Sequence, residues 1–287
     1  MLKVSVADAV IKLDIPHKFL GENMYKFRCG DSENEDIFIG MAQGQAPVFD
    51  LALDWDSVPL HTICRSGESN YYMLSPDNYV TYFQFNNDYS HFIINLNESL
   101  RADELDERSG KILFECVNSM LRRIFIMLVA ARGGVCLHSS TILSGGEAIC
   151  FSASSGTGKT THTNLWQEFI PDIEVLNGDM GYLFPKGKTA YFYSAPWCGT
   201  SGKCIAASAP VRAVVFLEQA KENALQRIGV PEIFMRLSSR CFIPAWDKNL
   251  NLKTINTAES LAGILDGCLL KCLPDIDAAR VCYYGLY

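Results

Sequence analysis

Residues 151–163 combine residue types that bind a phosphate group, and they read Phe-Ser-Ala-Ser-Ser-Gly-Thr-Gly-Lys-Thr-Thr-His-Thr. An apolar run precedes this loop of small residues, and a helical pattern follows it. The backbone N–H groups of such a loop turn inward, and the positive N-terminus of the next helix attracts an anion. Lys159 is expected to reach the β- and γ-phosphates, and the Thr160 hydroxyl to bind Mg²⁺. The segment therefore predicts binding of ATP with magnesium.

The loop departs from the usual G-x-x-x-x-G-K-[ST] pattern at one position, where Ala153 replaces the first glycine. Alanine fits there if its backbone φ is negative and is strained only if φ is positive. The alternative is an ordinary turn with a solvated lysine, but the order strand, loop and helix favours a phosphate site. The residues expected to bind the nucleotide are Ser155, Gly156, Thr157, Gly158, Lys159, Thr160 and Thr161.

Two further side chains could complete the chemistry around this loop. Asp179 follows an apolar run at 173–176, where a carboxylate could bind Mg²⁺ or accept a proton from an attacking hydroxyl. The alternative for Asp179 is a turn residue beside Gly178. His138, in the strand before the loop, could orient Asp179 or the substrate hydroxyl. A hydrogen-bonded core histidine explains His138 equally well.

Weaker signals come from the later part of the chain. Trp197 and Lys203 lie in a glycine-rich segment that could contact the substrate, with Lys203 meeting an anionic group, although an exposed hairpin with a packed tryptophan explains them equally well. Arg236 and Arg240 are four residues apart on an expected helix, so they could face one way, toward phosphate or toward solvent. His162 falls one turn into the helix after the loop, and we expect a structural role for it.

The loop, with a histidine twenty-one residues before its lysine, resembles the HPr kinase/phosphorylase catalytic domain. The loop is equally similar to the kinase-1 motif of ATP-dependent phosphoenolpyruvate carboxykinase, a structural relative, and Gly178-Asp179 is similar to its Gly-Asp-Asp. The runs 160–166 and 195–199 resemble a less studied HPr-kinase-like branch, some members of which accompany peptide-modification gene clusters. The resemblance covers roughly residues 132–220. One carboxylate stands where the family has two.

The resemblance implies an α/β fold: a P-loop kinase domain of the HPr kinase/phosphoenolpyruvate carboxykinase type with a β-rich N-terminal domain. It implies that Asp179 is the metal ligand or catalytic base, that His138 supports it and that Thr160 binds the metal. The implied reaction is ATP- and Mg²⁺-dependent phosphoryl transfer to a hydroxyl, that of serine in a peptide, a protein or the free amino acid. The implied assembly is a homo-oligomer. The alternatives are a nucleotide-binding regulatory or scaffold protein without efficient catalysis, or an interaction module.

The remaining sequence predicts the elements that position these residues. Residues 1–105 are rich in β-branched and aromatic residues, with a hairpin turn at 86–88, and predict a β-rich, antiparallel N-terminal domain. Doubled apolar positions at steps of four predict a helix over 112–131 that ends at Gly133-Gly134. We place it in a second domain, residues 106–287, with mixed strands and with helices over 159–169, 231–241 and 257–272.

Composition excludes several classes of protein. The net charge is −7, and no basic run offers the clustered cations that a nucleic-acid partner requires. Eleven scattered cysteines without a C-x-x-C pair indicate free thiols in a reducing compartment. The N-terminus lacks a signal-peptide pattern, and the most apolar helical stretch, 124–131, is too short to cross a bilayer. We therefore expect a cytoplasmic protein without a membrane partner.

Overall fold

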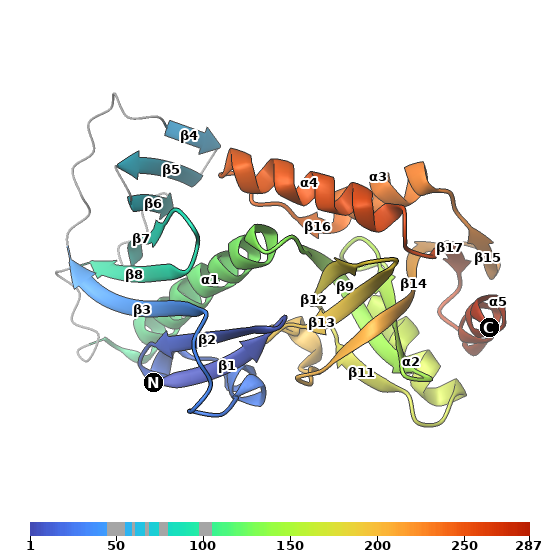
Figure 1. Ribbon diagram of the computed structural model, residues 1–287. Helices are drawn as coiled ribbons and strands as arrows, with labels where there is room; N and C mark the ends of the chain where they lie inside the picture. The colour runs from blue at the N-terminus through green and yellow to red at the C-terminus, as the bar shows by residue number, and fades with distance from the viewer. Residues whose placement is uncertain (45–54, 59–60, 67–68, 75–79, 98–104) are drawn as a thin grey trace. The chain divides into compact units, whose positions relative to one another are not determined.

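The computed structural model describes residues 1–44, 55–58, 61–66, 69–74, 80–97 and 105–287, and it is a mixed α/β structure (Figure 1). The chain forms two compact units, one of residues 1–131 with 244–252 and one of residues 132–243 with 253–287. This division differs from the predicted boundary at residues 105 and 106. The long helix α1 (Glu107–Ala131) belongs to the first unit, because it packs against two strands and a 3-10 turn of that unit.

The first unit contains an eight-stranded sheet in the order β1-β2-β3-β8-β7-β6-β5-β4. Its strands are β1 (Leu2–Val6), β2 (Ala9–Asp14), β3 (Ile37–Gly44), β4 (Trp55–Val58), β5 (His61–Ser66), β6 (Ser69–Leu74), β7 (Val80–Asn86) and β8 (His91–Asn97). The antiparallel pairing of β7 with β8 confirms the predicted hairpin. The sheet is not antiparallel throughout, because β3 runs parallel to both β2 and β8. Two 3-10 helices, η1 (His17–Phe19) and η2 (Glu22–Phe27), follow β2.

The second unit is built on a nine-stranded sheet. Its strands are β9 (Val135–Ser144), β10 (Glu147–Ser152), β11 (Glu174–Asn177), β12 (Met180–Lys186), β13 (Thr189–Ser194), β14 (Ser208–Gln219), β15 (Ala224–Arg227), β16 (Cys241–Phe242) and β17 (Gly267–Cys272). The main order is β10-β9-β12-β13-β14-β17-β15, and β14 also pairs in parallel with β10, so that the strand path returns to β10. Its helices are α2 (Lys159–Phe169), α3 (Val230–Arg240), α5 (Ile276–Leu286) and the 3-10 turn η3 (Gly199–Ser201), while α4 (Lys248–Ala262) spans both units.

The prediction of a helix over 257–272 is wrong for the second half of that range. Helix α4 ends at Ala262, and residues 267–272 form strand β17, parallel to β14. The first four residues of β17 are all buried, one after another, as in a strand that is covered on both faces. Such a short apolar run has no periodicity that separates strand from helix.

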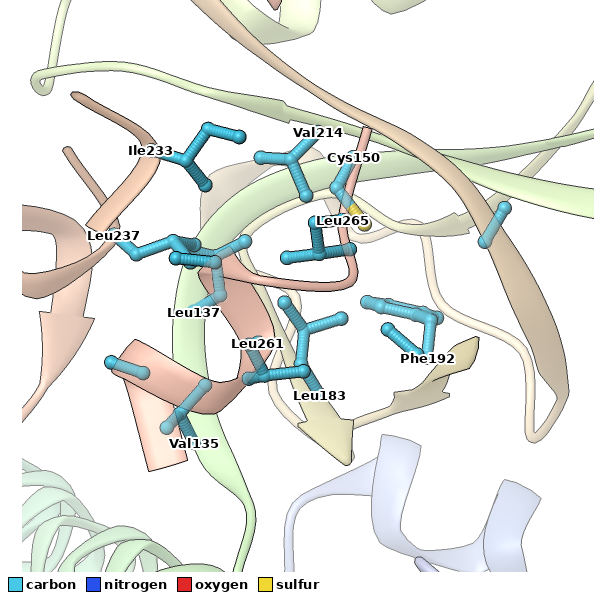
Figure 2. Close-up of a cluster of buried hydrophobic side chains, with 14 of the residues drawn as sticks. Val135, Leu137, Cys150, Leu183, Phe192, Val214, Ile233, Leu237, Leu261 and Leu265 are labelled. Carbon is cyan, nitrogen blue, oxygen red and sulfur yellow. The ribbon is translucent and has the colours of Figure 1, made fainter. Parts of the chain in front are cut away.

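Alternating side chains of the sheet form a separate core on each face. On one face, side chains of the sheet pack against Ile233 and Leu237 of α3 and against Leu261 of α4 (Figure 2). On the other face, Phe151 of β10 lies in a core with Trp166 of α2 and side chains of α5. Strand β10 is thus apolar on both sides, as a central strand between two helical layers must be. This packing fixes the end of β10, where the predicted loop begins.

No helix in the described part of the chain has the length and hydropathy needed to cross a membrane. The ten cysteines whose side chains the structure describes are free thiols.

Candidate functional site

The loop of residues 153–158 connects the end of β10 to the start of α2, as the sequence predicts. Gly156 and Gly158 have φ values of +80° and +115°, so both positions favour glycine. Four non-glycine residues in the described ranges have a positive φ, and Ala153 is not one of them. Alanine therefore fits the first position of the pattern, because the backbone there does not have a positive φ. Ala153 is buried in the core that contains Phe151.

The N-terminus of α2 borders the loop and is not capped by a side chain. The N-cap residue is Gly158, no side-chain cap hydrogen bond is formed, and the first turn contains no acidic residue. The first N–H groups of a helix need an external partner, and their positive end favours an anion. Thr160 and Thr161, in this first turn, are exposed. This arrangement is suited to bind phosphate oxygens.

Lys159 connects the loop to the two other predicted site residues. Its ammonium donates to the Ala153 carbonyl at 3.1 Å and to His138 Nε2 at 2.8 Å. His138 Nδ1 then lies 3.0 Å from the carbonyl oxygen of Asp179 and 3.4 Å from its carboxylate. Since Nε2 accepts from the ammonium, Nδ1 must carry the imidazole proton and donate it. The structure thus joins three residues that are far apart in the sequence.

Burial and nearby charges set the protonation of this chain. Burial lowers the pKa of Lys159, with Asp179 opposing the shift and Arg240 adding to it. Burial and the charge of Lys159 lower the pKa of His138 from its ordinary value of 6.5. The His138 imidazole is therefore neutral at pH 7. This state allows His138 to accept a hydrogen bond from Lys159 and to donate one to Asp179.

Asp179 is held in place by a residue that the sequence analysis missed. Asn177 is fully buried, and its side-chain oxygen accepts hydrogen bonds from the N–H groups of Asp179 (2.9 Å) and Met180 (3.0 Å). The amide nitrogen of Asn177 donates to the Ala195 carbonyl at 2.8 Å. The signal available in the sequence was a polar residue at the end of an apolar strand, directly before Gly178-Asp179. The carboxylate of Asp179 is one-quarter exposed, so it is open to a ligand.

Gly199 packs directly over Asp179, which gives a specific prediction. A Cβ atom at position 199 would lie 2.8 Å from Asp179 Cγ, closer than such atoms can approach. We expect Gly199→Ala to displace the carboxylate and to lower any reaction that depends on it about 10- to 100-fold. The measurement is the turnover rate of the purified variant.

Gly202→Ala is the matched control for Gly199→Ala. Both glycines have left-handed φ values, +57° and +65°, so alanine costs about 1–2 kcal/mol of backbone strain at either position. A Cβ at position 202 would meet nothing within 4 Å. If the two variants lose activity equally, the contact of Gly199 with Asp179 is irrelevant to function.

The loop opens onto a cavity of about 600 Å³, which we call the first cavity. The remaining walls come from the ends of β14 and α3, including Glu218, Arg236 and Arg240. Arg236 is paired with Glu218 (2.9 Å) and Glu232 (2.8 Å). Arg240 has no ion-pair partner among the described residues. The sequence predicted that the two arginines could share one face of a helix. No pattern in the sequence pointed to Glu218 as a residue of this cavity.

The two residues suggested for substrate contact lie elsewhere. Trp197 is buried. The ammonium of Lys203 lies against α2, where it donates to Gln167 (2.9 Å) and Asn164 (3.2 Å). Neither residue lines the first cavity.

No group of three or more His, Cys, Asp or Glu side chains in the described ranges is placed to hold a metal ion. Mg²⁺ is usually held by one or two carboxylates, substrate phosphates and water. The exposed Thr160 hydroxyl and the partly exposed Asp179 carboxylate are oxygen donors of the kind that Mg²⁺ takes. The protein side of such a site thus fits a magnesium nucleotide better than a free metal ion.

His162 is packed beneath the loop, as expected for a structural residue. The indole N–H of Trp166 donates to His162 Nε2 at 3.0 Å, and the His162 ring meets Phe151 edge-on with centroids 4.7 Å apart. Burial lowers the pKa of His162 from 6.5 to about 4.

The lowered pKa of His162 predicts a pH dependence of stability. The unfolded chain takes up a proton at this residue below pH 6.5, whereas the folded chain does so only near pH 4. The stability that His162 confers is therefore complete above pH 6.5 and falls by about 2.5 kcal/mol as the pH decreases to ~4.5. Urea unfolding of wild type and His162→Phe across this range measures it. A constant difference between the two proteins would contradict the assignment.

Comparison with known proteins gives structural likeness at a distance. No protein-family model matches the chain, and no curated protein matches its sequence. Among solved structures, the Hpr(Ser) kinase/phosphatase from Coxiella burnetii matches with a TM-score of 0.33 and 8% sequence identity. The match covers 52% of this chain and 95% of that one. A likeness at this level concerns the fold at a distance and carries no argument about the reaction of this chain.

Proposed function

We propose that this chain binds ATP with Mg²⁺ at the 153–158 loop and transfers the γ-phosphoryl group to a hydroxyl. The acceptor class we propose is the hydroxyl of serine in a peptide, a protein or the free amino acid. The observation that carries the proposal is the hydrogen-bonded chain Lys159–His138–Asp179 beside an uncapped helix N-terminus. This chain supports the proposal because a cation suited to phosphate lies near a carboxylate suited to accept a hydroxyl proton.

The phosphate side of the site is formed by the loop and Lys159. An ammonium has three N–H donors, and Lys159 uses two of them on Ala153 and His138. The third is available for a phosphate oxygen, together with the N–H groups that begin α2. Mg²⁺, when bound, neutralises charge on the phosphates. Arg240 adds a second cation, and its charge is near enough to lower the pKa values of both Lys159 and His138.

The acceptor side of the site is formed by Asp179. The hydroxyl oxygen attacks the γ-phosphorus, and its proton passes to the Asp179 carboxylate. The bond from the γ-phosphorus to the bridging oxygen breaks, and its electron pair leaves on ADP. His138 and Asn177 act as positioning residues, because they hold Asp179 and do not themselves donate to the acceptor. Catalysis in such a site consists of positioning and charge stabilisation.

One observation favours a second candidate, a nucleotide-binding regulatory or scaffold protein that turns over poorly. Asp179 would have to serve as both metal ligand and base. Glu218 is the carboxylate that lines the first cavity, and it is paired with Arg236 at 2.9 Å. Glu218 is therefore engaged by Arg236 rather than held ready for an acceptor hydroxyl.

Two measurements in parallel distinguish the two candidates. One is incubation with γ-labelled ATP and serine-containing acceptors, with and without Mg²⁺. The other is a calorimetric titration with ATP. Magnesium-dependent labelling of an acceptor supports the kinase. ATP binding without transfer and without hydrolysis supports the regulatory protein. Absence of ATP binding at millimolar concentration would reject both.

A further inference from the structure

A second cavity, of about 380 Å³, borders the same loop at residues 156–158. Its other walls come from the first turns of α2, the end of β14 and the turn between β17 and α5. Most of its walls are apolar, and they include Leu165, Leu217, Leu273 and Pro274. All of these elements belong to the second structural unit.

The two cavities differ in charge. The first cavity is lined by Glu218, Arg236 and Arg240, whereas no Asp, Glu, Lys or Arg is found among the residues that line the second. The loop with its uncapped helix N-terminus connects the two. A ligand that spans both must therefore carry negative charge at one end and a neutral, largely apolar body at the other.

A buried hydrogen-bond donor without a partner belongs to a residue in the wall of the second cavity. His162 lines this cavity and is only 3% exposed. Its Nε2 accepts from Trp166, so its proton must be on Nδ1. Nδ1 is buried and has no hydrogen-bond partner in the structure. A buried N–H without an acceptor is costly, and such groups are rare unless a ligand or water completes them.

We propose that the second cavity holds the nucleoside part of the nucleotide, with the base against the apolar walls and His162 Nδ1–H donating to one of its acceptor atoms. The inference rests on the proposed function, since it requires the triphosphate to lie on the 153–158 loop. Thr161, in the first turn of α2 and also lining this cavity, lies where the two parts of the ligand would join. The loop would then bind phosphate of any origin, and the second cavity would select for a nucleoside.

The test compares the magnesium complexes of ATP and of inorganic tripolyphosphate by calorimetry. Burial of a base against apolar walls should make wild-type protein bind ATP about tenfold to a hundredfold more tightly than tripolyphosphate. Ala220→Phe places a ring in the second cavity without removing an existing side-chain contact. We expect it to remove most of this preference while tripolyphosphate affinity stays within about twofold. Ala224→Phe, on the exposed strand β15, is the matched control.

Three results would overturn the inference: equal affinity of wild type for both ligands, no effect of Ala220→Phe on ATP, or equal weakening of both ligands by that variant. Should neither ligand bind to wild type, the proposed function itself is rejected. Nitrogen-15 NMR of the wild-type histidines tests the contact without any substitution. The His162 Nδ1–H signal should shift with ATP and not with tripolyphosphate, and a signal that ATP leaves unchanged would exclude this donor.

Discussion

Replacing Lys159 with methionine is expected to weaken ATP binding about 10- to 100-fold, the equivalent of one charge-assisted hydrogen bond. Methionine is similar in length and removes the only lysine ammonium that reaches His138 and the loop carbonyl in the described structure. The fold should change little in stability, because two hydrogen bonds are lost while an ammonium no longer has to be buried. Calorimetric titration and thermal unfolding of the same sample measure the two effects.

Lys203→Met is the matched control for Lys159→Met. Lys203 is exposed, and its ammonium lies on the surface of α2 against Asn164 and Gln167. We expect its ATP affinity to stay within about twofold of wild type, because exposed polar contacts contribute little. Equal affinity losses in the two variants would mean that ATP is attracted by overall charge rather than held by the loop.

Replacing Asp179 with asparagine is expected to lower phosphoryl transfer about 10²- to 10⁴-fold, the usual contribution of a general base. Asparagine keeps the size of the side chain and leaves the backbone carbonyl that accepts from His138. The substitution therefore removes the carboxylate while leaving the Lys159–His138 contact in place. The single-turnover rate with saturating ATP and Mg²⁺ measures the effect, since it excludes product release.

Asp172→Asn provides the matched control for the Asp179 variant. Asp172 is exposed in the turn after α2 and has a φ of +68°, a conformation that asparagine tolerates well. Its transfer rate should equal that of wild type. Full activity of Asp179→Asn would exclude Asp179 as the base.

The parts of the site that lie close together in sequence could be predicted, because local patterns determine them. The strand at 147–152, the loop and the helix at 159–169 have the predicted bounds. His138 was expected to orient Asp179, and the structure brings the two residues together. The contact between His138 and Lys159 could not be predicted, because this contact depends on how Lys159 folds back beneath the loop.

The walls of both cavities could not be predicted, because they depend on pairings between distant segments. Glu218 reaches the loop only because β14 runs parallel to β10, with Phe216 opposite Ser152. The apolar turn at 272–274 reaches it because residues 267–272 form a strand beside β14 rather than the predicted helix. Asn177 gave a signal only as a polar residue at a strand end. None of these features has a periodicity that a linear sequence displays.

The most direct test of the account is a crystal structure of the protein with Mg²⁺ and a non-hydrolysable ATP analogue. The account predicts the γ-phosphate within about 3 Å of Lys159 Nζ and of the N–H groups that begin α2. It also predicts that the Asp179 carboxylate faces the open side of that phosphate. A nucleotide bound away from the 153–158 loop, or a γ-phosphate directed away from Asp179, would contradict it.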